Sequence, residues 1–522
     1  MAVCVPLAPA VIIVSQMRSL LLVPLLVAVT AVATPIEARQ PETNPAYYFM
    51  LGRHRESEGK IEEAIAAHQR AIALAPESAE LRAELAGLYA RQDRVREALE
   101  TAEAALQRDP ANREANRILG FVYAAVAEQK QPFRPGDDPS QYSARAIAAL
   151  SKAQREGVLD VSLELMLGRL HLKARHHAEA IASLRRVVDD QPGYPEGAML
   201  LASAHSGAGD DAGAIRTLEA AVKETPSFFR GHVRLAELYD EAHRYTEAAA
   251  AYGAAHALGG TRADFSPQRA SALINAGDPA AARDVLVEAL GTKPNGADAG
   301  LLYLLGQAQR RLKDTDGAAA TVGKLKASFP KDPRGLYLGA QLLEDSGRIG
   351  DALAAFQELI TLTPDNTSIV YEYASLLEKG GRAADAERAL RDLLARDPLD
   401  ANALNSLGYM LADRGERLDE AVTLVQRALK IEPRNPSFLD SLGWAYFRQG
   451  KLDRAEGPLA EAAGRLPTSS AVQDHLGDLR MKQLRYVDAV AAWERALSGD
   501  GEAIDRADVE KKLRDARERI GK

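Results

Sequence analysis

The sequence predicts an all-α protein, an open solenoid built from repeated pairs of helices. Three observations predict this fold: a period of 34 residues that recurs thirteen times between Pro45 and Asp500, an alanine at one fixed place in every period, and a proline near the end of most periods. A period of this length accommodates two helices and their turns, and its recurrence is typical of helical-repeat proteins. We expect one further helix after the last repeat to cap the solenoid.

Each period carries the same residue types in the same order. A leucine followed by a small residue comes first, as in Leu407-Gly408 and Leu442-Gly443, and a tyrosine such as Tyr89 often follows three residues later. The recurring alanines are Ala64, Ala98, Ala146, Ala180, Ala214, Ala248, Ala282, Ala318, Ala352, Ala386, Ala421, Ala455 and Ala489. The closing prolines are Pro76, Pro110, Pro192, Pro226, Pro294, Pro330, Pro364, Pro398, Pro433 and Pro467.

These residue types have physical roles in a helix pair. A small residue after the leucine lets the second helix approach the first, because a larger side chain would hold the two apart. The alanine serves the same contact from the second helix, where alanine is the most favourable residue. Proline has no N–H to donate and cannot continue a helix, so it separates one pair from the next. Since one pair cannot bury its apolar face alone, stacked neighbours are expected to share a continuous core.

In this order of residues the chain resembles the tetratricopeptide repeat family over residues 45–500. The resemblance implies a right-handed α-solenoid of helix–turn–helix repeats, in which the first helix of each pair lines the concave face. It also implies that the fifth, ninth and twelfth residues of each first helix point into a groove. The fourth, seventh, eighth and eleventh residues are then expected to be buried.

The repeat starts divide the chain into segments. They fall near residues 45, 79, 113, 161, 195, 229, 263, 299, 333, 367, 401, 436 and 470. We assign repeats one to six to residues 45–262, with a loop insertion near 128–142 where prolines and Gly136 interrupt the third repeat. Residues 263–298 form a degenerate seventh repeat, because Arg269-Ala270 replaces the leucine–small pair. Repeats eight to thirteen occupy residues 299–500.

The segment 504–520 is predicted to be the capping helix. Val509, Leu513, Ala516 and Ile520 stand at helical spacing among charged residues, which predicts one buried and one solvated face.

The first 40 residues have a different composition. Arg18 precedes an uncharged, leucine- and valine-rich run from Ser19 to Pro35, followed by small residues, which is the layout of a secretory signal peptide. We predict that residues 1–38 are a signal peptide, that Met17 is the biological start, and that the mature chain is periplasmic. The alternative is that residues 19–36 remain as an inner-membrane anchor, the only part that would then contact a membrane.

Several functional classes are excluded by composition and motifs. A net charge of −8, with no basic stripe among aromatic residues, argues against nucleic-acid binding. The sequence has no glycine-rich phosphate loop, no His-Glu-x-x-His and no Gly-x-Ser-x-Gly, so we predict no enzyme activity and no cofactor. The single cysteine, Cys4, lies upstream of the predicted leader. His171 and His205 occupy the tyrosine place of adjacent repeats, so we expect them to pack inside and to bind no metal.

Aromatic and amide residues gather on the first helices of the later repeats. Tyrosine is scarce, with 16 in the chain, yet Tyr303, Tyr337 and Tyr371 fill the fifth place of three consecutive repeats. Tyrosine offers a large contact area and loses little entropy on binding, which suits peptide recognition. The predicted peptide-binding groove comprises Tyr303, Gln307, Tyr337, Gln341, Tyr371, Asn405, Tyr409, Asp440 and Trp444. The alternative is that the tyrosines pack under neighbouring first helices and meet no ligand.

The resemblance and the leader together predict a non-enzymatic protein–protein interaction scaffold of the bacterial cell envelope. It would bind a peptide or protein segment in its concave groove, and it resembles the periplasmic tetratricopeptide proteins that assist assembly of export, secretion or polysaccharide machinery. One alternative is a regulatory or substrate-delivery subunit for a separate envelope enzyme or export machine. Another is an anchored scaffold that holds complexes at the inner membrane. The sugar-transferase relatives carry asparagine at the sixth place of the first helix. The role of those relatives is not carried over, because this chain has other residues there: Leu304, Leu338, Glu372, Ser406 and Ser441.

Overall fold

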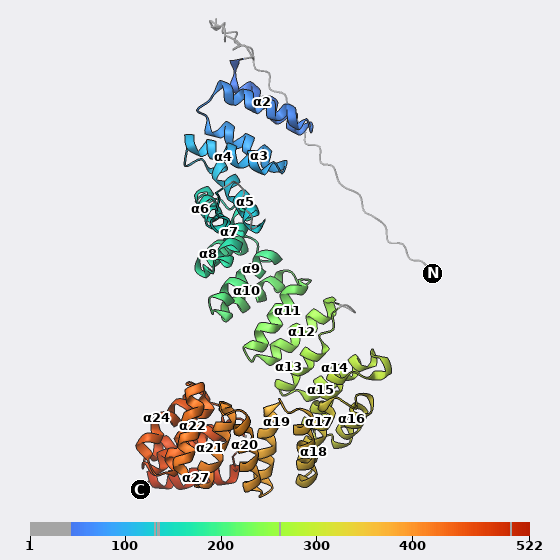
Figure 1. Cartoon of the computed structure of the whole chain (residues 1–522), viewed down its shortest axis with the longest axis vertical. Helices are drawn as coiled ribbons and strands as arrows, with labels where there is room; N and C mark the ends of the chain where they lie inside the picture. The colour runs from blue at the N-terminus through green and yellow to red at the C-terminus, as the bar shows by residue number, and fades with distance from the viewer. Residues whose placement is uncertain (1–42, 130–131, 133–135, 260–262, 502–503, 522) are drawn as a thin grey trace, which may run out of the picture. The chain divides into compact units, whose positions relative to one another are not determined.

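A computed structural model describes residues 43–129, 132, 136–259, 263–501 and 504–521 (Figure 1). These residues form 27 α-helices, joined by turns and short 3-10 segments, and contain no β-strand beyond one isolated bridge between Arg155 and Val158. The all-α repeat fold predicted from the period is therefore confirmed. The predicted signal peptide, the start at Met17 and the alternative anchor at residues 19–36 lie outside the described residues.

The helices alternate between the first and second member of each repeat. The first helices are α1 Pro45–Ser57, α3 Ala79–Arg91, α5 Arg113–Gln129, α7 Val161–Lys173, α9 Pro195–Gly207, α11 Phe229–Glu241, α13 Ser266–Asn275, α15 Ala299–Arg311, α17 Pro333–Asp345, α19 Thr367–Lys379, α21 Ala401–Arg414, α23 Pro436–Arg448 and α25 Ser470–Lys482. The second helices are α2 Ile61–Leu74, α4 Val95–Arg108, α6 Tyr142–Ala153, α8 His177–Asp190, α10 Asp211–Glu224, α12 Tyr245–Gly259, α14 Pro279–Gly291, α16 Thr315–Ser328, α18 Ile349–Leu362, α20 Ala383–Arg396, α22 Leu418–Ile431, α24 Leu452–Arg465 and α26 Tyr486–Ser498. The helix α27 Arg506–Ile520 follows them.

The chain divides into two compact units, one up to Val187 and one from Val188 onward, with the boundary inside α8. Each unit has its own core. In the first, the insertion of repeat three separates α5 from α6, and Pro139–Gln141 forms a 3-10 turn within it. Glu128 and Gln129, assigned to the loop from the sequence, belong to α5. The first residue of α6, Tyr142, is fully buried and stacks on Tyr123 with ring centroids 6.0 Å apart.

The contacts within each pair depend on small side chains. All thirteen recurring alanines are fully buried. A Cβ atom placed on Gly443 would lie 2.5 Å from Cγ of Leu459, and one on Gly408 would lie 2.6 Å from Cγ2 of Val425. Real Cβ atoms do not approach other carbons this closely, so a larger residue would force the helices apart. The predicted role of the small residues is therefore confirmed.

The first helix of repeat seven differs from the others. It begins at Ser266, three residues after the repeat start inferred from the sequence, and has 10 residues, whereas α15 has 13. Pro267 stands in its first turn, where the missing N–H of proline is tolerated. The carboxylate of Asp264 accepts a hydrogen bond from the Ser266 N–H at 3.0 Å and pairs with Lys293 at 2.9 Å. In a helix that began at Ala263, residue 267 would have to donate its backbone N–H to the carbonyl of the preceding turn, and proline has no N–H.

The C-terminal helix α27 packs on α26 through Val509, Leu513 and Ala516, which are all buried. The sequence placed Ile520 on this buried face as well, and that prediction was wrong, because Ile520 is 47% exposed. Arg519 already lies over the ring of Tyr486, the first residue of α26. Ile520 therefore lies beyond the surface that α26 provides.

Candidate functional site

The three fifth-place tyrosines lie on neighbouring first helices of the second unit. The ring centroids of Tyr303 on α15 and Tyr337 on α17 are 6.3 Å apart, and Tyr337 meets Phe356 edge-to-face at 6.2 Å. All three tyrosines, including Tyr371 on α19, are half-buried. They are therefore part of the contact between repeats and also reach the surface.

The hydroxyl groups of these tyrosines bind groups of the same chain. Tyr303 accepts a hydrogen bond from Gln307 at 2.5 Å. Tyr337 donates to the carboxylate of Glu372 at 2.8 Å, and Tyr371 donates to that of Asp400 at 2.6 Å. Burial and the Asp400 carboxylate raise the pKa of Tyr371 to about 12, so its hydroxyl stays neutral and acts as a donor.

A cavity opens beside two of the predicted residues. It has a volume of about 340 Å³ and is lined by Tyr303, Pro333, Arg334, Tyr337, Leu359, Thr363, Asn366, Ser368, Ile369 and Glu372. Glu372 was not among the residues predicted for the groove. The sequence does mark this residue, because the sixth place changes from leucine in the preceding repeat to glutamate here. The leucine, Leu338, is fully buried, whereas Glu372 puts a carboxylate at the same place.

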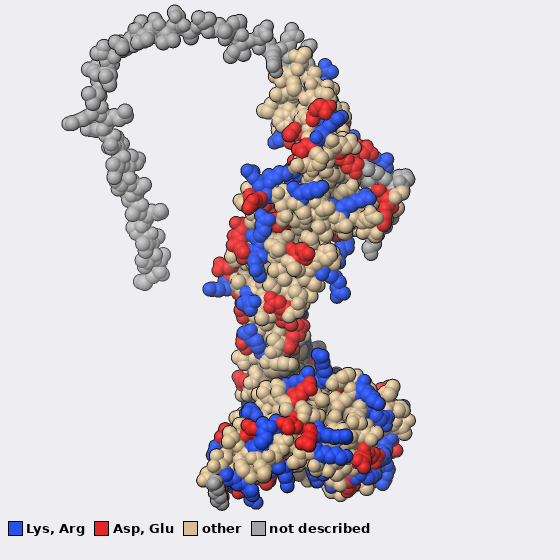
Figure 2. Space-filling model, turned by 90° about the vertical axis from the view of Figure 1, so that its left-hand side faces the viewer, with Lys and Arg blue, Asp and Glu red and all other residues tan. Residues whose placement is uncertain are grey.

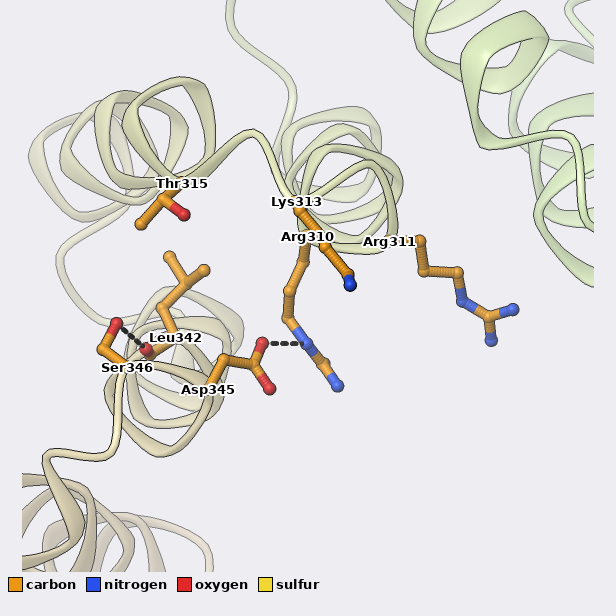
Figure 3. Close-up of a pocket in the computed structure, with 7 residues that line it drawn as sticks. All are labelled: Arg310, Arg311, Lys313, Thr315, Leu342, Asp345 and Ser346. Carbon is orange, nitrogen blue, oxygen red and sulfur yellow. Dashed lines mark hydrogen bonds and ion pairs between the residues drawn. The ribbon is translucent and has the colours of Figure 1, made fainter. Parts of the chain in front are cut away.

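The predicted glutamines are held by neighbouring side chains. Gln341 accepts a hydrogen bond from Arg310 at 2.6 Å, and Arg310 also pairs with Asp345 at 2.7 Å. A second cavity of about 600 Å³ lies here, lined by Arg310, Arg311, Lys313, Thr315, Leu342, Asp345 and Ser346. Figure 3 shows Arg310 turned toward Asp345, while Arg311 points away from that pair.

The predicted residues of repeat twelve are not open to solvent. Asp440 and Trp444 on α23 are 7% and 8% exposed. The indole of Trp444 is sandwiched between Phe447, with ring centroids 5.0 Å apart, and His475 on α25, at 4.1 Å. The sequence placed these two side chains in the groove, but they fill the contact between repeats, because His475 covers the ring.

His475 is a second residue that sequence analysis did not select. Its Nδ1 atom lies 3.0 Å from the carboxylate of Asp440. Burial alone would lower the pKa of His475, but the Asp440 carboxylate, with Asp474 and Asp478 nearby, raises that pKa above its ordinary value. The pair is thus a buried ion pair that joins repeats twelve and thirteen.

The two predicted residues of repeat eleven, Asn405 and Tyr409, are half-buried on α21. The side-chain oxygen of Asn405 has no hydrogen-bond partner among the described residues. Burial, together with the carboxylates of Asp413 and Asp440, raises the pKa of Tyr409, so its hydroxyl remains protonated. The Asn405 oxygen is therefore a buried acceptor, which a partner would reach only if the side chain moved.

Two further histidines were singled out from the sequence. His171 and His205 are 9% and 6% exposed, so the prediction that they pack inside is confirmed. In the described part of the chain, no group of three or more His, Cys, Asp or Glu residues is placed to hold a metal. No helix among the described residues has the length and apolar character needed to cross a membrane. On the face drawn in Figure 2, basic and acidic side chains are interspersed.

Two protein-family models, both described as tetratricopeptide repeat, match the chain. One matches residues 143–195, 165–227, 199–263, 337–387, 371–436 and 414–470, and the other matches residues 57–120 and 273–342. Together they cover more than half of the sequence. Among curated proteins, the chain is similar to "TPR repeat-containing protein PA4667" of Pseudomonas aeruginosa, with 34% identity over 164 residues. This match spans 31% of the chain and 28% of that relative's length.

Solved structures of helical-repeat proteins are also similar to the chain. A tetratricopeptide repeat protein from Parabacteroides merdae is 18% identical, with a TM-score of 0.40 over 48% of this chain and 97% of that one. Yeast Tom70 is 14% identical, with a TM-score of 0.41 over 91% and 95%. YrrB, titled "a TPR protein with an unusual peptide-binding site", is 20% identical, with a TM-score of 0.32 over 37% and 92%.

Proposed function

We propose that this chain, which belongs to the tetratricopeptide repeat family, is a protein–protein interaction scaffold. Its first helices in repeats eight to eleven bind an extended segment of a partner protein. One observation carries the choice of surface. Tyr303 and Tyr337, from the same place of consecutive repeats, line one cavity of about 340 Å³. We call the surface formed by the fifth- and ninth-place side chains of α15, α17, α19 and α21 the first-helix face, and the corresponding residues of α23, Asp440 and Trp444, lie beneath it.

The side chains of the first-helix face suit a peptide backbone and its side chains. Tyrosine rings give apolar contact area, and the amides of Gln307 and Gln341 have further donors and acceptors beyond those that bind Tyr303 and Arg310. Hydrogen bonds to a backbone depend little on the sequence of the bound segment, so this surface favours recognition that tolerates variation. In this proposal Asp440 and Trp444 support the face from beneath and do not touch the partner. No residue is assigned a catalytic role.

Site-specific photo-crosslinking tests the proposed surface. The full chain carries p-benzoylphenylalanine either at Gln341, on the first helix α17, or at Gln357, exposed on the second helix α18 of the same repeat. We expect irradiation in cell-envelope extracts to join a partner protein at Gln341 and not at Gln357. A partner joined only at Gln357 would place binding on the second helices and contradict the proposal.

We also propose that the chain acts in the periplasm of a bacterium. The support comes from the sequence, where Arg18 precedes the apolar run Ser19–Pro35 and a small-residue exit. The expected mature N-terminus is Thr34 or Arg39, and N-terminal sequencing of protein from a periplasmic extract checks it. Protein that begins at Met1 or Met17 and remains in the membrane fraction would instead support the anchored alternative.

A further inference from the structure

We propose that the cavity between α17 and α19 is a subsite for an arginine side chain of the bound segment, with the carboxylate of Glu372 as its counter-ion. The inference rests on the proposed function, because it assigns a chemistry to one part of the first-helix face. Four features of the described residues carry it: a carboxylate without a cation, basic neighbours that are held elsewhere, two aromatic walls, and a cavity of matching size.

The carboxylate of Glu372 is half-buried and lacks an ion pair. Its two oxygens share the one proton of the Tyr337 hydroxyl, at 2.8 and 2.9 Å, and no ion pair of the described residues includes Glu372. Burial, and then the charge of Glu344, raises the pKa of Glu372, while Tyr337 and Arg310 lower it. A partly desolvated carboxylate is stabilised most by a cation with hydrogen-bond donors, whereas among the described residues the one group that donates a hydrogen bond to Glu372 is the neutral Tyr337 hydroxyl, and Arg310 acts on it only through its charge.

Two basic residues of this region, Arg334 and Arg310, are held by other carboxylates. Arg334 lines the cavity, but its Nε donates to Asp332 Oδ1 at 2.9 Å and its terminal nitrogen donates to Oδ2 at 2.5 Å. Arg310 binds Asp345 at 2.7 Å and Gln341 at 2.6 Å. Both guanidinium groups are therefore engaged, and the position beside Glu372 is left for a cation from outside the chain.

The walls of the cavity favour a flat cation. The rings of Tyr303 and Tyr337 line it with centroids 6.3 Å apart, and aromatic faces attract cations. Asn366 and Ser368 add oxygen acceptors at the rim. A guanidinium group carries five donors in one plane and stacks on aromatic rings, so arginine uses these groups better than lysine does.

Charge disfavours other classes of occupant. The volume of about 340 Å³ lies at the lower end of the range for small-ligand sites, roughly 300–1,000 Å³, and is large enough for a side chain. An acidic side chain would be repelled by Glu372 and Glu344. An apolar side chain would remove the remaining water from the carboxylate without replacing its hydrogen bonds, which is unfavourable.

The test compares two peptides that differ in charge but hardly in shape. Fluorescein-labelled Ala-Ala-Arg-Ala-Ala amide, and the same peptide with citrulline in place of arginine, are titrated with the full chain, and anisotropy reports binding up to millimolar protein. We expect the arginine peptide to bind about tenfold more tightly, the scale of one charge-assisted hydrogen bond with a cation–π contact. In Glu372→Gln the two peptides should bind equally. The matched control Glu358→Gln, an exposed carboxylate on the second helix α18, should keep the full preference.

Three results would overturn the inference. The first is the absence of saturable binding by the arginine peptide, and the second is an equal affinity for both peptides in the unmodified chain. The third is a preference that emerges only in Arg334→Gln, because Arg334 would then be the natural occupant. Unchanged circular dichroism and melting of Glu372→Gln exclude misfolding as the cause of a lost preference. Crosslinking at Gln341 without arginine selectivity would retain the proposed function and remove only this subsite.

Discussion

The hydroxyl of Tyr337 shares its one proton between the two carboxylate oxygens of Glu372, at 2.8 and 2.9 Å, and Glu372 belongs to the next repeat. The pair joins α17 to α19 at the wall of the 340 Å³ cavity. Because no cation of the described residues pairs with Glu372, the tyrosine hydroxyl is the main group of the chain that stabilises the charge. One tyrosine thus contributes both to the packing of the repeats and to the surface that we propose for binding.

Removal of this hydroxyl is expected to destabilise the C-terminal repeats. In Tyr337→Phe the half-buried carboxylate loses its donor, which costs about 1–3 kcal/mol. Addition of Glu372→Leu, the residue type of the same place in the two preceding repeats, should recover most of that loss because the unpaired acceptor is gone. Urea denaturation at pH 7 measures both variants. A single variant as stable as the unmodified chain would show that Glu372 does not need the hydroxyl.

The stability of the contact between repeats twelve and thirteen should depend on the protonation of His475. Its pKa is raised above the ordinary value of 6.5 despite burial, because the carboxylate of Asp440 lies 3.0 Å from Nδ1. A histidine with a raised pKa contributes stability that is fully present below pH 6.5 and is lost as the pH rises through the folded-state value. We expect NMR titration to place the pKa of the His475 imidazole above 6.5.

The control for this titration is Asp440→Asn, which keeps the shape of the side chain and removes its charge. The pKa of His475 should then fall, because burial is no longer offset by the nearest carboxylate. His68 and His171, whose pKa values burial lowers, should be unaffected and serve as internal references. A pKa for His475 below 6.5 in the unmodified chain would contradict the ion pair.

Two glycines of repeat twelve should respond oppositely to alanine. In Gly443→Ala the new Cβ would lie 2.5 Å from Cγ of Leu459 and 3.0 Å from its backbone nitrogen, so α23 and α24 must separate. We expect a loss of about 1–3 kcal/mol. Gly464 on the exposed side of α24 has no atom within 4 Å of that position, so Gly464→Ala should gain up to about 1 kcal/mol of helix propensity. Equal effects in urea denaturation would contradict the packing argument.

Repeat seven is expected to open more readily than its neighbours. Its first helix α13 has only 10 residues and lacks the leucine–small pair, so it offers less apolar surface to α12 and α15. Native-state hydrogen exchange should therefore be faster in Ser266–Asn275 than in α15 or α17. Equal protection across these three helices would show that the short helix is as stable as the regular ones.

The repeat pattern predicted the helices well because the residues that define it also determine their ends and contacts. The recurring alanines and the glycines after leucine must be small wherever two helices cross, so their spacing fixes the pairs. The start of α13 differed by three residues because Pro267, outside that pattern, restricts its own first turn. The cap was placed correctly, but the length of surface available to Ile520 depends on where α26 begins, which the pattern does not encode.

The candidate site was predictable only in part. The fifth place correctly selected Tyr303 and Tyr337 as neighbours, since one period separates them. The ninth place of α23 did not show that Trp444 is covered, because His475 reaches the indole ring from a different place in the following repeat. Glu372 stands at the sixth place, to which the register assigned neither the groove nor the core, and its access to the cavity depends on the side-chain positions of Tyr337 and Arg334. Contacts of this kind arise between repeats and are not specified by the period.

The most direct test of the central claim is hydroxyl-radical footprinting of the full chain with a peptide from the partner crosslinked at Gln341. The method reports the solvent accessibility of individual side chains. We predict that the peptide protects Tyr303, Tyr337 and Tyr371 and leaves Val287 and Leu362, 55% and 60% exposed on second helices, as reactive as before. Protection of Val287 or Leu362, with the three tyrosines unchanged, would contradict binding on the first-helix face.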